Sequence, residues 1–153
     1  AITFTTAPMR GQRIERGGAT FIIDCYNANP ESVRLGLQSF EALRFSGRRV
    51  LILGDMLELG ELAESYHRGL GRSLGGYRAD VIALVGPLSQ FTTESAKQAG
   101  VAAKSLFHFN DAVSCAKDID RLIKPGDLVY LKGSRGIGLE RVFDAYSGGG
   151  GQN

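Results

Sequence analysis

The sequence lacks the features that mark several large classes of protein. No apolar run is long enough to cross a bilayer and no signal peptide is recognisable, so we expect no membrane partner. The formal net charge is only +2 and no basic run occurs, which argues against nucleic acid as a partner. The two cysteines provide neither a disulfide framework nor a metal-ligand spacing, so the expected location is a reducing cytoplasm.

Recognisable catalytic machinery is missing as well. No Ser/His/Asp or Cys/His arrangement stands out, and no G-x-x-x-x-G-K-[ST] phosphate loop occurs. The glycine-rich segment 132–138 has neither the upstream glycine of that loop nor the glycine order of a dinucleotide fingerprint. A Rossmann oxidoreductase would carry a glycine-rich turn after its first strand, and residues 24–30 contain none. What remains is a chain of 153 residues with ordinary globular composition, enough for one domain.

Strand-like and helix-like segments alternate along the chain. A hairpin through Gly17 and Gly18 is expected to join residues 10–15 to the first strand of a parallel sheet. This order predicts an α/β fold, a Rossmann-like, doubly wound and mostly parallel sheet with one antiparallel strand and helices on both faces. The expected strands are 19–25, 49–54, 80–85, 105–109 and 127–131, and the expected helices are 31–45, 61–74, 89–99, 111–123 and 139–146.

Helix ends and helix faces can also be predicted. Asn29 fits as an N-cap with Pro30 at the first helical position, and Asn110 is the candidate cap of helix 111–123. His67 lies in the middle of helix 61–74, where a structural role is favoured over a catalytic one. The face expected to meet the core in that helix is formed by Leu62, Tyr66 and Leu70.

Polar or glycine-rich turns follow the expected parallel strands, at 24–30, 54–60, 86–87 and 132–138. Because the carboxyl ends of parallel strands meet at one edge of a sheet, these turns are expected to gather there, where open α/β sheets bind ligands. Their carboxylates, amides, lysine and arginine suit a nucleotide or a small zwitterion. Structural roles remain open for the same residues: Asp24, Asn29, Asp55 and Glu58 as caps, and segment 132–138 as a tight turn with solvated charges.

Three of these turns together resemble one family. The segments are DCYNANP at 24–30, LGDMLELG at 53–60 followed by His67, and LKGSR at 131–135, in that order. They resemble the C-terminal domain of the MurF-type Mur ligases, which join D-alanyl-D-alanine to UDP-N-acetylmuramoyl-tripeptide. The resemblance divides the chain into an interdomain linker at 1–9, the ligase domain at 10–146 and a flexible glycine-rich tail at 147–153.

The resemblance implies a three-domain, ATP-dependent ligase of peptidoglycan synthesis. In this family an N-terminal domain binds the UDP-sugar peptide, and a central domain carries the phosphate loop and the Mg²⁺ sites. The C-terminal domain closes over ATP and brings the incoming dipeptide, whose amine attacks an acyl phosphate. This sequence matches only that third part, so we expect an excised domain that folds alone, contributes no catalytic residue and is inactive by itself.

The resemblance also implies site residues. On the ATP side, Asp24 is expected at the ribose hydroxyls, and a linker arginine near ATP matches Arg13, with Arg10 as a near rival. The remaining ATP-side residues are Tyr26, Asn27 and Asn29. The dipeptide side is expected to consist of Lys132, Gly133, Ser134 and Arg135, with Asp55 at the dipeptide's ammonium group.

Two further hypotheses fit the same residues. The chain is also compatible with the equivalent domain of a sister Mur or folylpolyglutamate-type ligase that uses another amino acid, although the pattern at Met56–Leu59 argues against it. A free nucleotide-binding module, a binding protein rather than part of an enzyme, is the other alternative. A phosphate-loop domain immediately upstream in the reading frame would decide for a ligase.

Overall fold

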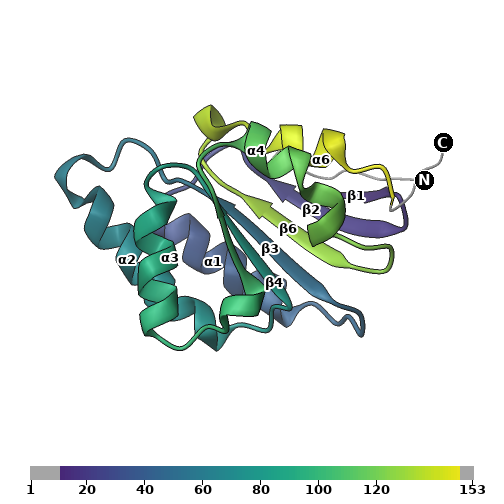
Figure 1. Ribbon diagram of the computed structural model, residues 1–153, viewed down its shortest axis with the longest axis horizontal. Coiled ribbons are helices and arrows are strands. Elements are labelled where there is room, and N and C mark those ends of the chain that lie inside the picture. Colours follow the sequence, from purple (N-terminus) through teal and green to yellow (C-terminus); the bar gives the residue numbers. More distant parts are fainter. Residues whose placement is uncertain (1–10, 149–153) are drawn as a thin grey trace.

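A six-stranded sheet forms the centre of the computed structural model, which describes residues 11–148 (Figure 1). Within these residues the sheet order is β1-β2-β6-β3-β4-β5, with β1 and β2 antiparallel and the other neighbours parallel. The α/β prediction of a mostly parallel sheet with one antiparallel strand is therefore confirmed. The strands are β1 Gln12–Arg16, β2 Ala19–Asp24, β3 Arg49–Gly54, β4 Val81–Val85, β5 Leu106–Phe109 and β6 Leu128–Lys132.

Helices cover both faces of the sheet. One face packs against α1 Pro30–Ala42, α2 Ala63–Ser73 and α3 Ser89–Gln98. The other packs against α4 Ala112–Lys117, α5 Ile119–Leu122 and α6 Glu140–Ala145, which lie together in Figure 1. Across residues 11–148, no helix has both the length and the apolar character that a membrane span needs.

The strand order brings three strand ends together. The central strands are buried along their whole length and mostly apolar, as residues 50–53 of β3 illustrate, because a parallel sheet is covered on both faces. The chain runs from β2 through α1 to β3 on one face, and later returns from β5 through α4 and α5 to β6, which lies between β2 and β3. The carboxyl ends of β2, β6 and β3 are thus neighbours at a reversal of strand order, where doubly wound folds bind ligands.

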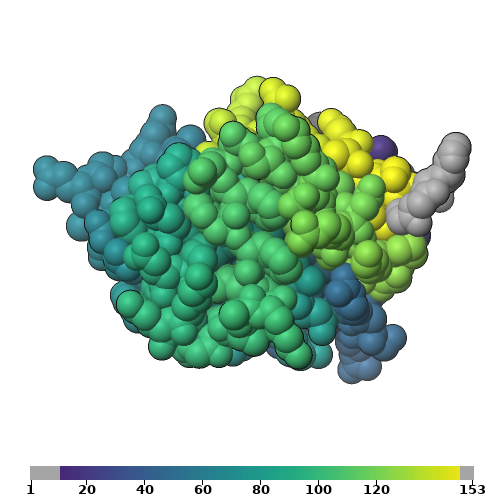
Figure 2. Space-filling view, viewed as in Figure 1, coloured from purple at the N-terminus to yellow at the C-terminus, as the bar shows by residue number. Residues whose placement is uncertain are grey.

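The predicted core face of α2 is confirmed only at Leu70, which packs against the core. Leu62 is 55% exposed and Tyr66 is 43% exposed, whereas His67 is fully buried and Gly71 is buried. A Cβ atom on Gly71 would lie 2.3 Å from the carbonyl oxygen of Thr92, so α2 and α3 pack backbone to backbone through the glycine. In Figure 2 the blue-teal segment that leads into α2 stands out from the body of the molecule.

The predicted helix caps have mixed outcomes. Asn29 caps α1 as expected: its side chain accepts a bond from Ser32 N at 2.9 Å, and Ser32 Oγ accepts one from Asn29 N at 3.0 Å. At the helix predicted for 111–123 the cap is Asp111 rather than Asn110, since the Asp111 carboxylate accepts from Ser114 N. That helix is also divided at Asp118 into α4 and α5.

Candidate functional site at the carboxyl edge of the sheet

Asp24 ends β2 and is held by two donors from the neighbouring strand. Asp24 Oδ2 accepts from Lys132 Nζ at 3.0 Å and from the Tyr130 hydroxyl at 3.3 Å. Residues 130 and 132 are two apart on β6, so both side chains lie on one face of the sheet. Among residues 11–148 no hydrogen bond is made to the other oxygen, Oδ1.

A hollow of about 390 Å³ opens beside this carboxylate. Its walls supply a carboxylate, an ammonium group, an amide and hydroxyls, a set suited to a polar ligand. The volume suits a small ligand or part of a larger one. The lining residues are Gly11, Asp24, Tyr26, Asn27, Ser32 and Lys132.

Arg135 and Tyr26 form the outer rim of this edge. The guanidinium carbon of Arg135 lies 5.2 Å from the centre of the Tyr26 ring, within the range of a cation–π contact. Arg135 is exposed and opens the short 3-10 turn η4 Arg135–Ile137. A planar cation held on an aromatic ring from another turn is well placed to receive a carboxylate through two parallel bonds.

Ser134 ties three of the strand-end turns together. Its hydroxyl accepts from Leu57 N at 2.8 Å and donates to the carbonyl oxygen of Ala28 at 3.3 Å, while its own N–H donates to Asp55 O at 3.0 Å. Gly133 lets the turns cross, because a Cβ atom there would lie 2.9 Å from Gly54 Cα. These two residues, predicted as ligands of the dipeptide, therefore build the support beneath the rim.

Both carboxylate oxygens of Asp55 accept hydrogen bonds from within the protein. Its side chain is buried, Oδ1 accepts from Ser89 Oγ at 2.7 Å, and Oδ2 accepts from Leu88 N at 2.9 Å. The carboxylate thus caps the N-terminus of α3, where the helix dipole favours a negative charge. The sequence left a capping role open for Asp55, and the structure places that cap at α3.

His67 fixes the turn after β3. The imidazole is fully buried, Nε2 accepts from Met56 N at 3.1 Å, and Nδ1 lies 2.7 Å from the carbonyl oxygen of Ala63. These partners assign the proton to Nδ1 in a neutral ring. The structural role expected of His67 is confirmed, but no signal in the sequence indicates its backbone partner Met56, eleven positions earlier in the chain. Glu58, in the same turn, has a φ of 63°, which is rare outside glycine.

Arg13 lies on the edge strand next to β2. It pairs with Ile22, so it shares the sheet face of Asp24, and its side chain is exposed. The rival arginine, Arg10, lies outside the described residues, as do the predicted linker 1–9 and most of the predicted tail.

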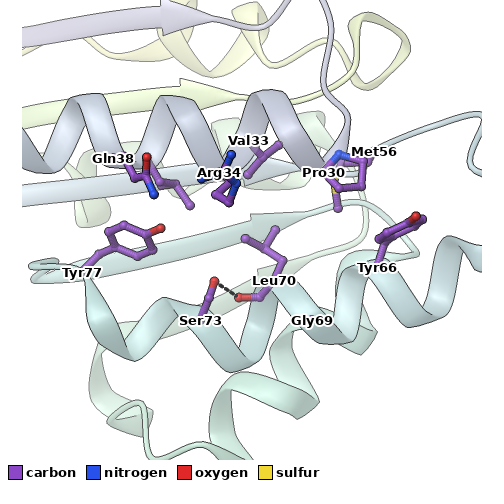
Figure 3. Close-up of a pocket in the computed structure, with 11 residues that line it drawn as sticks. Pro30, Val33, Arg34, Gln38, Met56, Tyr66, Gly69, Leu70, Ser73 and Tyr77 are labelled. Atoms are coloured by element: carbon purple, nitrogen blue, oxygen red, sulfur yellow. Dashed lines mark hydrogen bonds between the residues drawn. The ribbon is translucent and has the colours of Figure 1, made fainter.

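A second hollow lies between α1 and α2 and is mostly apolar (Figure 3). Its volume is about 330 Å³. Its cation, Arg34, already pairs with Glu31 at 2.8 Å, and Figure 3 places Tyr66 and Tyr77 at its two ends. The lining residues are Pro30, Val33, Arg34, Leu37, Gln38, Met56, Tyr66, Gly69, Leu70, Ser73 and Tyr77. It offers packing surface but few groups for chemistry.

Among residues 11–148, this edge has neither a reactive thiol nor a cluster of metal ligands. Cys25 follows Asp24 but is fully buried, and burial raises the pKa of its thiol to about 12. Across residues 11–148, no three His, Cys, Asp or Glu side chains are arranged to hold a metal ion. The polar groups that line the hollow are of kinds that can bind and orient a ligand.

The sequence matches a family model described as the Mur ligase, glutamate ligase domain, over residues 9–135. Curated relatives described as UDP-N-acetylmuramoyl-tripeptide–D-alanyl-D-alanine ligase include one from Bacillus subtilis, 32% identical over 86% of this chain and 30% of the relative. Another, from Mycobacterium tuberculosis, is 34% identical over 95% of this chain and 33% of the relative. The chain thus spans about a third of the length of these relatives.

Solved structures agree with these matches. MurF ligase from Thermotoga maritima in complex with ADP has a TM-score of 0.72 at 29% identity, covering 94% of this chain and 31% of that one. MurF from Acinetobacter baumannii has a TM-score of 0.78 at 30% identity, covering 90% and 30%. A murein peptide ligase from Psychrobacter arcticus, at 18% identity and a TM-score of 0.61, shares the fold.

Proposed function

The chain belongs to the Mur ligase family, and we propose that it is the C-terminal domain of the ATP-dependent ligase that adds D-alanyl-D-alanine to UDP-N-acetylmuramoyl-tripeptide. The observation that carries the proposal is the anchored Asp24 carboxylate beside a polar hollow at the carboxyl edge, with one oxygen that no group within residues 11–148 bonds. The names of the relatives support the substrate pair. The ADP complex of one structural neighbour supports nucleotide binding.

On the ATP side, Asp24 Oδ1 accepts from the ribose hydroxyls. A carboxylate suits two adjacent hydroxyls because it only accepts hydrogen bonds. Tyr26 and Asn27 line the same hollow, Asn29 lies at the start of α1, and Arg13 approaches from the edge strand. Each of these groups binds or orients ATP and leaves the reacting phosphate to other parts of the enzyme.

On the dipeptide side, the exposed Arg135 receives the carboxylate of D-alanyl-D-alanine. Lys132, Gly133 and Ser134 act beneath it, because Lys132 is 4% exposed and paired with Asp24 while Ser134 holds the turns together. In this proposal Asp55 makes no direct contact with the dipeptide, since both of its carboxylate oxygens accept hydrogen bonds inside the protein.

The remaining parts of the reaction belong to the other domains of the ligase. In this proposal a central domain cradles the ATP phosphates and holds Mg²⁺, an N-terminal domain binds the UDP-sugar peptide, and the enzyme works in the cytoplasm. Phosphoryl transfer depends on a phosphate-cradling loop, its lysine and a metal ion, and this sequence contains no such loop. The purified chain is therefore expected to fold and to show neither ATP hydrolysis nor ligation.

The proposal is tested by the selectivity of one substitution in the full-length ligase. Asp24→Asn should weaken ATP more than it weakens 2′,3′-dideoxy-ATP, because the dideoxy analogue lacks the hydroxyls that the carboxylate accepts. Michaelis constants for the two nucleotides give the comparison. Equal losses for both would place Asp24 outside the ribose site and would contradict the proposal.

A further inference from the structure

Gly36 stands in the middle of α1, where glycine is a poor helix former. A Cβ atom at this position would lie 1.9 Å from the Tyr130 hydroxyl oxygen and 3.0 Å from the ring carbon that bears it. Alanine, the best helix former, is therefore excluded as long as Tyr130 keeps its place. The absent side chain makes room for a single atom, the hydroxyl oxygen of a residue on β6.

That hydroxyl is buried and has a defined partner. Tyr130 is 3% exposed, its ring stacks on Phe40 at 5.2 Å between centres, and its hydroxyl donates to Asp24 Oδ2. Burial, followed by the nearby Asp24 charge, raises the pKa of Tyr130, so the phenol remains a neutral donor. It holds the carboxylate without cancelling the negative charge.

Lys132 donates to the same oxygen. Rotation of the carboxylate about its bond to Cβ would carry Oδ2 away from both donors, so the two bonds together restrain the orientation of its plane. Both bonds go to Oδ2, and within residues 11–148 neither donor bonds to Oδ1. The arrangement accounts together for a glycine inside a helix, a buried phenol and a half-satisfied carboxylate.

We infer that Gly36 and Tyr130 are positioning residues that orient the Asp24 carboxylate for the two hydroxyls of a ribose. Neither residue touches the nucleotide; both act through Asp24. The inference rests on the proposed nucleotide site and adds the residues that set its preference for a ribonucleotide.

The test compares ATP with 2′,3′-dideoxy-ATP in titrations of the chain, followed by amide chemical shifts. Tyr130→Phe should weaken ATP about three- to tenfold, the range expected for one ordinary hydrogen bond, and should weaken the dideoxy analogue less than about twofold. Tyr146→Phe is the matched control, since that phenol is also buried and donates to a backbone oxygen, of Gly17, in the β1–β2 hairpin. It should leave both affinities unchanged.

Gly36→Ala tests the same link from the helix. It should reduce ATP affinity selectively when Tyr130 is present, and the loss should shrink in the Tyr130→Phe background, because the two changes remove the same contact. Additive losses, or equal losses for both nucleotides, would overturn the inference.

The outcomes separate this inference from the proposed function. If Asp24→Asn removes the preference for ATP while Tyr130→Phe leaves it intact, the nucleotide site stands and the positioning role is refuted. If the wild-type chain shows no preference between the two nucleotides, both are refuted.

Discussion

Two layers of the same sheet edge use similar residues for opposite purposes. In the inner layer, Asp55, Ser134 and His67 are buried and have all their partners inside the protein. In the outer layer, Arg135 is exposed and contacts the partly exposed Tyr26 beside the polar hollow. A polar side chain at a strand end is therefore not by itself a ligand-binding group.

Asp24 belongs to both layers. One oxygen is fixed by Lys132 and Tyr130, as in the inner layer, and the other is open, as in the outer layer. The comparison predicts that inner substitutions reduce stability first, that outer substitutions reduce ligand binding first, and that Asp24 links the two.

The largest expected effect is in the inner layer, at Asp55. Asp55→Ala removes the acceptor of two bonds and leaves Leu88 N without its partner, which should lower the free energy of unfolding by about 3 kcal/mol. Urea denaturation followed by circular dichroism measures the loss. Asp55→Asn keeps the shape and one acceptor and should cost less. If Asp55→Ala leaves the free energy of unfolding unchanged, the bonds to this carboxylate do not stabilise the fold, and the assignment of Asp55 to the inner layer is wrong.

Arg135 tests the outer layer. In the full-length ligase, Arg135→Ala should raise the KM for D-alanyl-D-alanine about 10- to 150-fold, equivalent to roughly 1.5–3 kcal/mol for a charged hydrogen bond, with far less effect on the KM for ATP. Unfolding should change little, because the side chain is exposed.

The matched control for Arg135 is Arg121→Ala, an exposed arginine paired with Asp118 and placed before β6 rather than after it. It should change neither Michaelis constant. If Arg135→Ala affects both substrates equally, the carboxylate of the dipeptide binds elsewhere.

The two buried thiols should make the free energy of unfolding depend on pH. Burial raises the pKa values of Cys25 and Cys115 from 9.0 to about 12. Between these values the unfolded chain loses thiol protons that the folded chain keeps, so the thiols' contribution to stability should be constant below pH 9 and fall as the pH rises above it. The slope should approach about 1.4 kcal/mol per pH unit for each thiol. Urea denaturation at pH 8, 9 and 10 measures it, and the Cys25→Ala/Cys115→Ala variant should show a shallower slope.

The smallest expected effect separates two roles of Asn29. Asn29→Ala should lower stability by about 1 kcal/mol through loss of the α1 cap. Asn29→Asp keeps a cap and should restore stability. If Asn29 also binds ATP, as we propose, Asn29→Asp will not restore ATP affinity. If Asn29→Asp restores both the stability and the ATP affinity, Asn29 acts only as a helix cap.

Much of the fold was predictable because its signals are local. The apolar run of β3 predicted a buried parallel strand, and Asn29 with Pro30 predicted the start of α1. The core face of α2 was not predictable in this way, because hydrophobicity favours Leu62 and Tyr66 while the packing depends on the close approach of Gly71 to α3. Because backbone atoms make this contact, no apolar side chain in the sequence indicates it.

The residues of the candidate site were likewise predictable only in part. Strand-end position and residue type placed Asp24 and Arg135 at one edge, which the structure confirms. They did not separate exposed from buried groups, because the burial of Asp55 depends on Leu88 and Ser89, more than thirty positions away. The link from Gly36 through Tyr130 to Asp24 is equally non-local.

The central claim is that this edge, and not the apolar groove between α1 and α2, binds the nucleotide. Titration of the ¹⁵N-labelled chain with ATP tests it most directly, since both regions lie in one molecule and each reports through its own amides. The account predicts shift changes at residues 24–29 and 132–135, with an affinity of about millimolar or weaker for half of a two-domain site. Changes confined to the groove, at residues 69–73 and Tyr77, would contradict it.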